Sequence, residues 1–444
     1  MQEKITIIGA GLVGSLLTCL LAERGYKIEL FEKRADPRNK SLNAGKSINL
    51  ALSDRGLRAL QLVDLKKEVS EHLIPMKGRL MHNQAEELTF QPYGKEGQAI
   101  NSVSRSGLNL ALLEKADSYE NVEIIFNQKC LNVDLENTSA KFKSYETKEI
   151  IETDGDWIIG SDGAFSSVRF AMQKTNRFNY EQNFIEHGYK ELEIPATESG
   201  DFAMDKNALH IWPRKSFMLI ALPNPDKSFT CTLFLAYEGE ESFENLKTPE
   251  QINSFFKTEF PDAFKLIPDL LEQFQQNPTS SLVTIKCKPW LRNKTLIMGD
   301  ASHAIVPFYG QGMNSGFEDC RIFVEMLDEN EGNWKKTTEQ FNETRIKDAN
   351  AIADLALRNF VEMRNSVSNP DFLLRKKMEA KISQAIPDQW MPLYSMVTFS
   401  HTPYSEALEI GKKQDEIMAE IMKNKKLIEN WETVDWKKVM IDYI

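Results

Sequence analysis

The amino-acid sequence predicts an α/β protein, α+β overall, in which a βαβ unit opens the chain and helices close it. Residues 4–8 and 27–31 have the pattern of short buried strands, and residues 14–24 between them have the pattern of a helix. Apolar and polar residues alternate in segments between about 178 and 285, which indicates mixed or antiparallel strands. After about residue 335 the apolar residues take helical spacing.

Composition limits the classes of partner. The 444-residue chain is long enough for two or three structural units, and its formal net charge of −11 argues against nucleic acid as the main partner. The five cysteines are widely spaced and odd in number, so we expect no zinc site, no disulfide framework and a reducing, cytoplasmic compartment. These cysteines are Cys19, Cys130, Cys231, Cys287 and Cys320.

The N-terminal segment superficially resembles a secretory signal peptide, because Lys4 is followed by an apolar run from Ile5 to Ala22. Three glycines at fixed offsets interrupt that run, which a nucleotide-binding strand, turn and helix explain better. No other stretch is apolar over the roughly 18 residues that a membrane span needs. We therefore expect no membrane partner.

The strongest local motif is Gly9-Ala10-Gly11-Leu12-Val13-Gly14, directly after the first strand. Gly9 permits a tight turn, Gly11 lets a pyrophosphate approach the backbone, and Gly14 lets the helix pack closely. The helix N-terminus supplies amide donors, and Glu32 after the next strand would accept from ribose hydroxyls. The alternative is a glycine-rich turn with no ligand. The motif predicts nucleotide binding, but it does not separate NAD, NADP and FAD.

Two later segments narrow the choice: residues 160–169 contain Asp162-Gly163, and residues 296–304 contain Gly299-Asp300. A glycine-punctuated run over residues 307–320 then leads into a helical pattern. Taken alone, both aspartates have the pattern of turn residues. In this order, however, the three motifs resemble the single-component flavoprotein aromatic hydroxylases. The resemblance implies a Rossmann-like FAD-binding domain that holds FAD non-covalently, a mixed-sheet substrate domain and C-terminal helices.

The resemblance assigns cofactor contacts. It places Asp300 at the ribityl chain, Arg105 at the flavin, and the backbone amides of Met313 and Asn314 near N1 and the C2 carbonyl of the ring. A helix N-terminus there would stabilise the negative charge of reduced flavin. The cofactor-binding residues that we expect are Gly9, Gly11, Val13, Gly14, Glu32, Arg34, Ala51, Arg105, Asp300, Gly312, Met313 and Asn314.

Four further segments, residues 45–53, 187–189, 210–214 and 392–400, resemble the kynurenine 3-monooxygenase family in particular. That resemblance implies L-kynurenine as the substrate. It also implies the substrate-binding residues Arg79, Tyr93, Asn359 and Tyr394, with Arg79 and Tyr93 at the amino-acid carboxylate. A planar guanidinium can hold a carboxylate bidentately and a phenol adds a donor. Without the resemblance, Tyr93 and Tyr394 would be interpreted as packing aromatics.

The implied reaction is hydroxylation of L-kynurenine to 3-hydroxy-L-kynurenine by NADPH and O2 through a flavin C4a-hydroperoxide, in kynurenine catabolism or NAD biosynthesis. No obligatory catalytic side chain and no metal are expected, and His303 is interpreted as a structural histidine. NADPH has no second fingerprint, so its site is not located. The alternatives are a hydroxylase of another small aromatic acid, a flavin protein that only binds, and a plain NAD(P) dehydrogenase.

The expected domains follow from these assignments. Residues 1–177 with 286–345 would form the FAD-binding domain, with 75–95 contributing to the substrate side. Residues 178–285 would form the substrate-side sheet, and 346–444 a C-terminal helical region. Eukaryotic members of the resembling family carry a C-terminal membrane anchor that this sequence lacks, so we expect a bacterial-type cytosolic enzyme that is a monomer or a weak homodimer.

Overall fold

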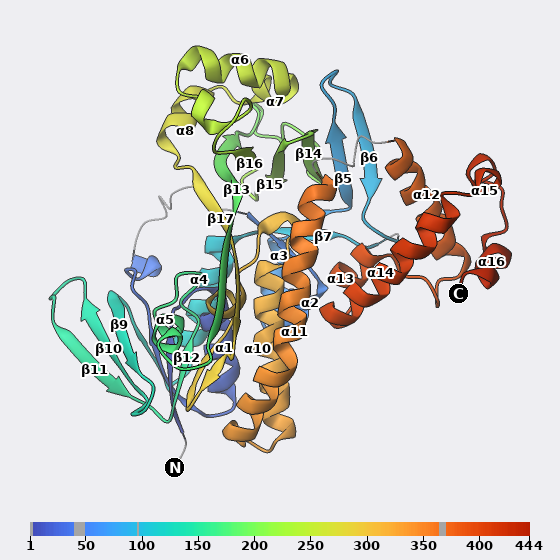
Figure 1. The fold of residues 1–444 in the computed structure, drawn as a ribbon. Helices are drawn as coiled ribbons and strands as arrows, with labels where there is room; N and C mark the ends of the chain where they lie inside the picture. The colour runs from blue at the N-terminus through green and yellow to red at the C-terminus, as the bar shows by residue number, and fades with distance from the viewer. Residues whose placement is uncertain (1–2, 40–48, 96, 364–369) are drawn as a thin grey trace.

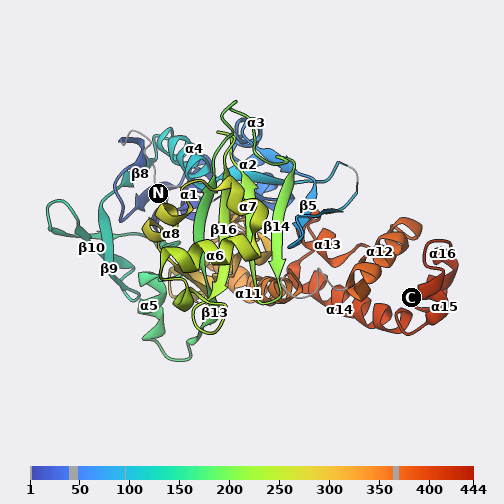
Figure 2. The ribbon, with the colours of Figure 1, turned by 90° about the horizontal axis from the view of Figure 1, so that it is seen from above.

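The structure is a computed structural model that describes residues 3–39, 49–95, 97–363 and 370–444. Two large sheets lie one above the other in Figure 1, and the long helices α10 and α11 run along them. These helices span Gly312–Glu329 and Trp334–Val361. The C-terminal helices extend away from the sheets in both views (Figures 1 and 2).

The first sheet has, among the described residues, the strand order β18-β19-β12-β1-β2-β8. Strand β1 pairs in parallel with β2 and with β12, while β18 is antiparallel to β19. Every residue of β12 is buried, as expected for a parallel sheet covered on both faces. The strands predicted at residues 4–8 and 27–31 are confirmed as β1 and β2. Their bounds are β1 Lys4–Ile8, β2 Lys27–Phe31, β8 Val122–Ile125, β12 Trp157–Gly160, β18 Leu291–Arg292 and β19 Thr295–Ile297.

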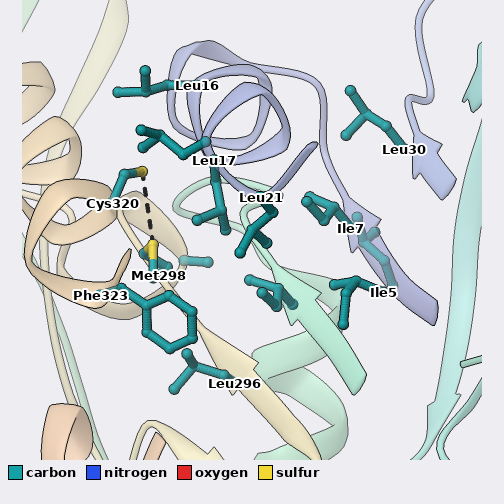
Figure 3. Close-up of a cluster of buried hydrophobic side chains, with 14 of the residues drawn as sticks. Ile5, Ile7, Leu16, Leu17, Leu21, Leu30, Leu296, Met298, Cys320 and Phe323 are labelled. Carbon is teal, nitrogen blue, oxygen red and sulfur yellow. Dashed lines mark hydrogen bonds between the residues drawn. The ribbon is translucent and has the colours of Figure 1, made fainter. Parts of the chain in front are cut away.

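Helix α1, Leu12–Glu23, packs between the first sheet and α10 (Figure 3). It is buried from Gly14 to Ala22, so it is apolar on nearly all sides, as an interior helix must be. In Figure 3, Leu17 and Leu21 of α1 meet Cys320 of α10 and the strand residues below them. This shared core fixes the glycine-rich turn at the start of α1 against the sheet.

The second sheet has, within the described ranges, the strand order β17-β13-β16-β15-β14-β5-β6. The alternating segments at 188–194 and 229–235 lie in β13 and β16, so these predicted strands are confirmed. Strands β5 and β6, which come from residues 78–92, join the sheet at one edge. The strands are β5 Gly78–His82, β6 Leu88–Pro92, β13 Asn179–Ile194, β14 Ala208–Arg214, β15 Phe217–Pro223, β16 Phe229–Ala236 and β17 Ser280–Lys288.

Three helices that the sequence interpretation missed cover the upper face of this sheet in Figure 1: α6 Pro249–Glu259, α7 Pro261–Leu266 and α8 Leu270–Gln276. The sequence interpretation assigned this segment to strands because apolar and polar residues alternate in the segments before it. A local signal was present, since Thr248 and Gln251 form a capping box around a proline at the first helical position. Phenylalanines of these helices pack against the sheet and complete its second core.

Smaller elements complete the chain. Two three-stranded sheets among the described residues have the orders β11-β10-β9 and β3-β7-β4. Two expected domain boundaries fall inside elements, 285/286 in β17 and 345/346 in α11. None of the helices in the described ranges is long and apolar enough to cross a membrane. The remaining elements are β3 Asn49–Leu52, β4 Ile74–Met76, β7 Ile100–Ser104, β9 Gln128–Asp134, β10 Ser139–Ser144, β11 Ile150–Asp154, α2 Asp54–Gln61, α3 Lys66–Glu71, α4 Arg105–Asp117, α5 Ser167–Gln173, α9 Asp300–His303, α12 Pro370–Ala385, α13 Leu393–Phe399, α14 Tyr404–Ile421, α15 Lys425–Glu429 and α16 Trp436–Val439.

A buried chain of polar side chains ties the second sheet to α7. His82 Nδ1 lies 2.5 Å from Asp262 Oδ2, and His82 Nε2 lies 2.9 Å from His210 Nδ1. His210 Nε2 lies 2.8 Å from the carbonyl oxygen of Asp205. Burial lowers the pKa of His210 to about 4. His210 is therefore neutral near pH 7, and its Nε2–H donates to that carbonyl.

We expect the free energy of unfolding to fall as pH is lowered from about 6.5 towards 4. The His210 pKa is lowered in the folded chain, so in this range the unfolded chain binds a proton that the folded chain does not. Between pH 7 and 5 this difference is worth about 2 kcal/mol. Urea unfolding of wild type and His210→Gln as a function of pH measures this loss of stability. Parallel pH profiles of the free energy of unfolding for the two proteins would show that His210 is not its source.

Candidate cofactor and substrate site

A cavity of about 750 Å³ is lined by residues of both large sheets and by the start of α10. Gly9 and Gly11 line one end, and Arg79, Tyr93 and Tyr394 line another part of the same cavity. Its volume is at the large end of the roughly 300–1,000 Å³ that ligand sites occupy. The structure thus brings together residues that lie far apart in the sequence.

The three glycines of the N-terminal motif have different geometry. Gly9 has φ +107°, and a Cβ there would lie 2.6 Å from the Ser161 carbonyl oxygen. A Cβ on Gly14 would lie 1.9 Å from the Gly9 carbonyl oxygen, so only glycine lets α1 pack under the turn. A Cβ on Gly11 would meet no atom within 4 Å, and Gly11 lines the cavity. Gly11 therefore leaves room for a ligand at the backbone.

Glu32, at the end of β2, lines the cavity and also holds the glycine-rich turn. Its carboxylate accepts hydrogen bonds from the backbone N–H of Ala10 at 2.9 Å and of Arg34 at 3.0 Å. A carboxylate has about four acceptor positions, so these two bonds leave capacity for a ribose hydroxyl. Arg34 lines the cavity beside it. Glu32 therefore holds the glycine-rich turn in place. This structural role is additional to the contact with a ribose that the sequence predicts.

The start of α10 forms another wall of the cavity, where Gly312 and Met313 lie. The Asn314 side chain donates to the carbonyl oxygens of Ala51 and Gly310, both at 2.7 Å, and accepts from the Ser53 N–H at 2.9 Å. Asn314 therefore joins β3 to the loop before α10 and lies behind the cavity wall. The first amides of a helix have no partner within the helix, which leaves them available to an electron-rich ring.

Asp300 is the first residue of α9 and faces the cavity. Desolvation raises the pKa of its carboxyl, and the nearby charges of His303 and Arg105 oppose that shift. Asp162 also lines the cavity, but its carboxylate accepts from the Ser167 N–H at 2.6 Å near the start of α5. Asp162 thus has the turn role that its position after a strand suggests.

His303 is a structural residue, in agreement with its interpretation from sequence. Its Nε2 lies 2.5 Å from Asp319 Oδ2, its ring stacks on Trp290 with centroids 5.2 Å apart, and its exposed fraction is 3%. It is absent from the cavity lining among the described residues. The histidine connects α9 to α10, the two helices that flank the loop of residues 304–311, which we name the cofactor loop.

Arg79 lies among tyrosines. Its guanidinium carbon is 4.9 Å from the ring centroid of Tyr394 and 5.6 Å from that of Tyr93. The ring of Tyr394 stacks between those of Tyr93 and Tyr309, with centroids 5.3 Å apart in both pairs. The buried Arg79 Nε has no hydrogen-bond partner within the described part of the chain. A buried donor without a partner favours an anionic or acceptor ligand at this point.

Three predicted site residues are not brought to the cavity wall: Gly14, Asn314 and Asn359. Asn359 is 4% exposed, and its side-chain N–H donates to the Phe308 carbonyl oxygen at 2.6 Å. Its expected contact with substrate stays a prediction. Residues 45–48, from one segment that carried the resemblance, lie outside the described residues.

Sequence interpretation missed part of the lining. Tyr309 lies in the glycine-punctuated run over residues 307–320, but only Gly312, Met313 and Asn314 of that run were assigned a role. Apolar residues of the second sheet also line the cavity, among them Leu209, Met218, Ile220 and Phe234. Their alternation marks one face of a sheet, yet alternation alone does not show which face meets a ligand. Tertiary packing decides that.

The lining fits FAD. A glycine-rich turn at a helix start suits the pyrophosphate, Glu32 suits a ribose, Asp300 lies where it can meet a polyol, and the start of α10 suits a flat ring. The open space above Gly11 is the observation that tests this fit, because a side chain there would occupy the path of the cofactor. Among the described residues, no group of three or more His, Cys, Asp or Glu is placed to hold a metal ion.

Comparisons with known proteins agree with this geometry. Residues 2–347 match the family model described as FAD binding domain. Kynurenine 3-monooxygenase from Christiangramia forsetii is 46% identical over 444 residues, covering 100% of this chain and 99% of that protein. The enzyme of the same name from Myxococcus xanthus is 47% identical over 422 residues, covering 95% and 91%. The structure of 2-methyl-3-hydroxypyridine-5-carboxylic acid oxygenase has a TM-score of 0.68 at 18% identity, covering 83% of this chain and 94% of that one.

The fold and the cavity, with the family match, define an FAD-binding flavoprotein. Because relatives above 40% identity cover nearly the whole chain, the chain belongs to the kynurenine 3-monooxygenase family. The expected FAD-binding fold is thereby confirmed, and a plain NAD(P) dehydrogenase is not supported.

Two alanine substitutions should separate the roles of the glycines. Gly11→Ala should leave the stability of the FAD-free protein unchanged within about 0.5 kcal/mol, because its backbone is extended and no protein atom is near, yet weaken FAD binding about tenfold or more. Gly14→Ala should lower both the stability of the FAD-free protein and its affinity for FAD, because the added Cβ would clash with the Gly9 carbonyl oxygen. Thermal unfolding and FAD titration of the apoproteins measure the two effects, and equal losses of stability would contradict the assignment.

Proposed function

We propose that this protein hydroxylates L-kynurenine to 3-hydroxy-L-kynurenine, with FAD as a non-covalent cofactor and NADPH and O2 as co-substrates. The observation that carries the proposal is Arg79, half-buried among three tyrosines, in the same cavity as the glycine-rich turn. The names of the relatives support the choice of kynurenine. A cytoplasmic location, and a monomer or weak homodimer, stay predictions from sequence.

Arg79 would bind the carboxylate of the amino-acid group of kynurenine. Arginine stays charged at any ordinary pH, and its fork of donors matches a carboxylate. Burial raises the pKa of Tyr93, Tyr309 and Tyr394, so these phenols stay protonated and can donate hydrogen bonds. A protonated phenol carries no negative charge, so it does not repel the carboxylate of the substrate as a phenolate would.

The apolar face of the second sheet would hold the aromatic ring. Met218, Ile220 and Phe234 line the cavity there, and such a surface excludes water while leaving the ring free to face the flavin. With the amino-acid group held by Arg79, the ring has one orientation along the cavity. Orientation of this kind is the main contribution that the chain itself makes to the reaction.

FAD, when bound, accepts electrons from NADPH and supplies the chemistry that activates O2. The residues at hand to hold it are Glu32 at the ribose, Asp300 at the ribityl chain and the turn before α10 at the ring. The positive end of the α10 dipole favours the negative charge of the reduced ring. No side chain of the described cavity lining is assigned as an obligatory acid or base.

The proposal is tested by following NADPH oxidation by the purified FAD-bound protein with and without L-kynurenine, with the product identified by mass. Oxidation should be stimulated by kynurenine, and the product should be heavier by one oxygen atom. A protein that holds FAD and ignores kynurenine, but responds to another small aromatic acid, would keep the fold and overturn the substrate.

Replacing Arg79 by methionine should raise KM for L-kynurenine about ten- to a hundredfold, because a hydrogen bond to a charged group is worth about 1.5–3 kcal/mol. FAD content should not change. Kynuramine, which lacks the carboxylate, provides the matched control. Wild type should use kynuramine poorly, and Arg79→Met should lose most of the preference for kynurenine. A preserved preference would show that Arg79 does not contact the carboxylate.

A further inference from the structure

Arg55, on the first turn of α2, is completely buried and lies at the meeting point of three helices. Its Nε donates to the Val397 carbonyl oxygen at 2.8 Å, and Nη2 donates to the carbonyl oxygens of Met396, at 3.3 Å, and of Thr402. Its Nη1 donates to Glu318 of α10 at 2.6 Å. One guanidinium therefore joins α2 and α10 to the segment around α13.

The contacts with α13 have a clear physical purpose. This helix spans only Leu393–Phe399, and the last four carbonyl groups of a helix have no partner within it. Met396 and Val397 belong to that last turn, so Arg55 donates to two of its terminal carbonyl groups. The Met396 carbonyl also accepts from Ser400 Oγ at 2.6 Å, so the Val397 carbonyl depends more on Arg55. A cation at the C-terminal end of a helix is also favoured by the helix dipole. Arg55 acts as a C-terminal cap from another part of the chain.

Helix α13 carries Tyr394, which stacks with Tyr93 and lies under the Arg79 guanidinium. Two residues before Arg55, the Ser53 N–H donates to Asn314 at the start of α10. The short segment 53–55 is thus bonded to the start of α10 at one end and to α13 at the other. Displacement of α13 would move Tyr394 relative to both.

We propose that Arg55 is a positioning residue for substrate binding, which holds Tyr394 in register with Arg79 and the cofactor loop by capping α13. The proposal rests on the function proposed above, since it concerns the same site. Arg55 is absent from the cavity lining among the described residues, so it acts on substrate through Tyr394 and does not contact it.

Arg55→Lys is the informative substitution. Lysine keeps a positive charge beside Glu318, whereas methionine would remove the cation paired with Oε1 of this buried carboxylate and leave Arg345 as its main partner. Lysine lacks the planar fork, so it does not reproduce donors to three carbonyls. Arg358→Lys is the matched control, because Arg358 pairs with Asp415 at 2.6 Å and joins α11 to α14 without contact to α13 among the bonds found in the described residues.

We expect Arg55→Lys to raise KM for L-kynurenine about fivefold or more, with kcat changed less than about twofold and FAD content unchanged. Arg358→Lys should leave KM within about twofold of wild type. In a Tyr394→Leu background, Arg55→Lys should add less than about twofold, because the residue through which it acts is gone. An unchanged KM, or an equal fold-change in both backgrounds, would overturn the proposal.

A measurement without turnover separates this proposal from the proposed function. Hydrogen exchange over residues 393–402 should be faster in FAD-bound Arg55→Lys than in wild type, while exchange in α1 is the same in both. If wild type does not hydroxylate kynurenine, the proposed function fails and this measurement still decides the role of Arg55. Unchanged exchange over 393–402 would refute the capping role whatever the substrate is.

Discussion

The site depends on two adjacent buried carboxylates of α10, Glu318 and Asp319. Arg345 of α11 donates to both, at 2.8 and 2.7 Å, while Arg55 and His303 complete the set. Desolvation alone would raise the pKa of both carboxyls, but the interactions with these neighbouring side chains outweigh it and lower the pKa. Because loss of one partner of a buried pair costs about 3–5 kcal/mol, the network holds four helices in a single arrangement.

That network flanks the cofactor loop, because His303 ends α9 before the loop and the carboxylates lie on α10 after it. Helix α10 begins at the cavity wall and carries the carboxylates on its second turn, so the charges that fix the helix also fix the loop. Through Glu318 the same helix is bonded to the residue that caps α13. Helix α10 therefore holds both the cofactor end and the substrate end of the cavity. Such rigidity is required when a reaction depends on the distance between two bound molecules.

The sequence predicted those features that depend on residues close to one another in the chain. The turn after β1 follows from glycine spacing, and the first sheet follows from short apolar runs. Arg79 and Tyr394, in contrast, were assigned only through resemblance, because a lone arginine or tyrosine carries no local signal of a ligand. The contact between Arg55 and Val397 joins residues 342 positions apart, and the inward face of Tyr309 depends on packing. No pattern over neighbouring residues reports such contacts.

The chain makes the two ends of this cavity at different times. Met313 is the last residue, in the order of synthesis, of the cofactor-side lining expected from sequence. Tyr394 and the helix that carries it come much later in the chain. Chains fold from the N-terminus as they leave the ribosome, so the compartment for FAD can close before the substrate end is completed by Tyr394. The order of synthesis thus lets a nascent chain complete its cofactor compartment while the substrate end still lacks Tyr394.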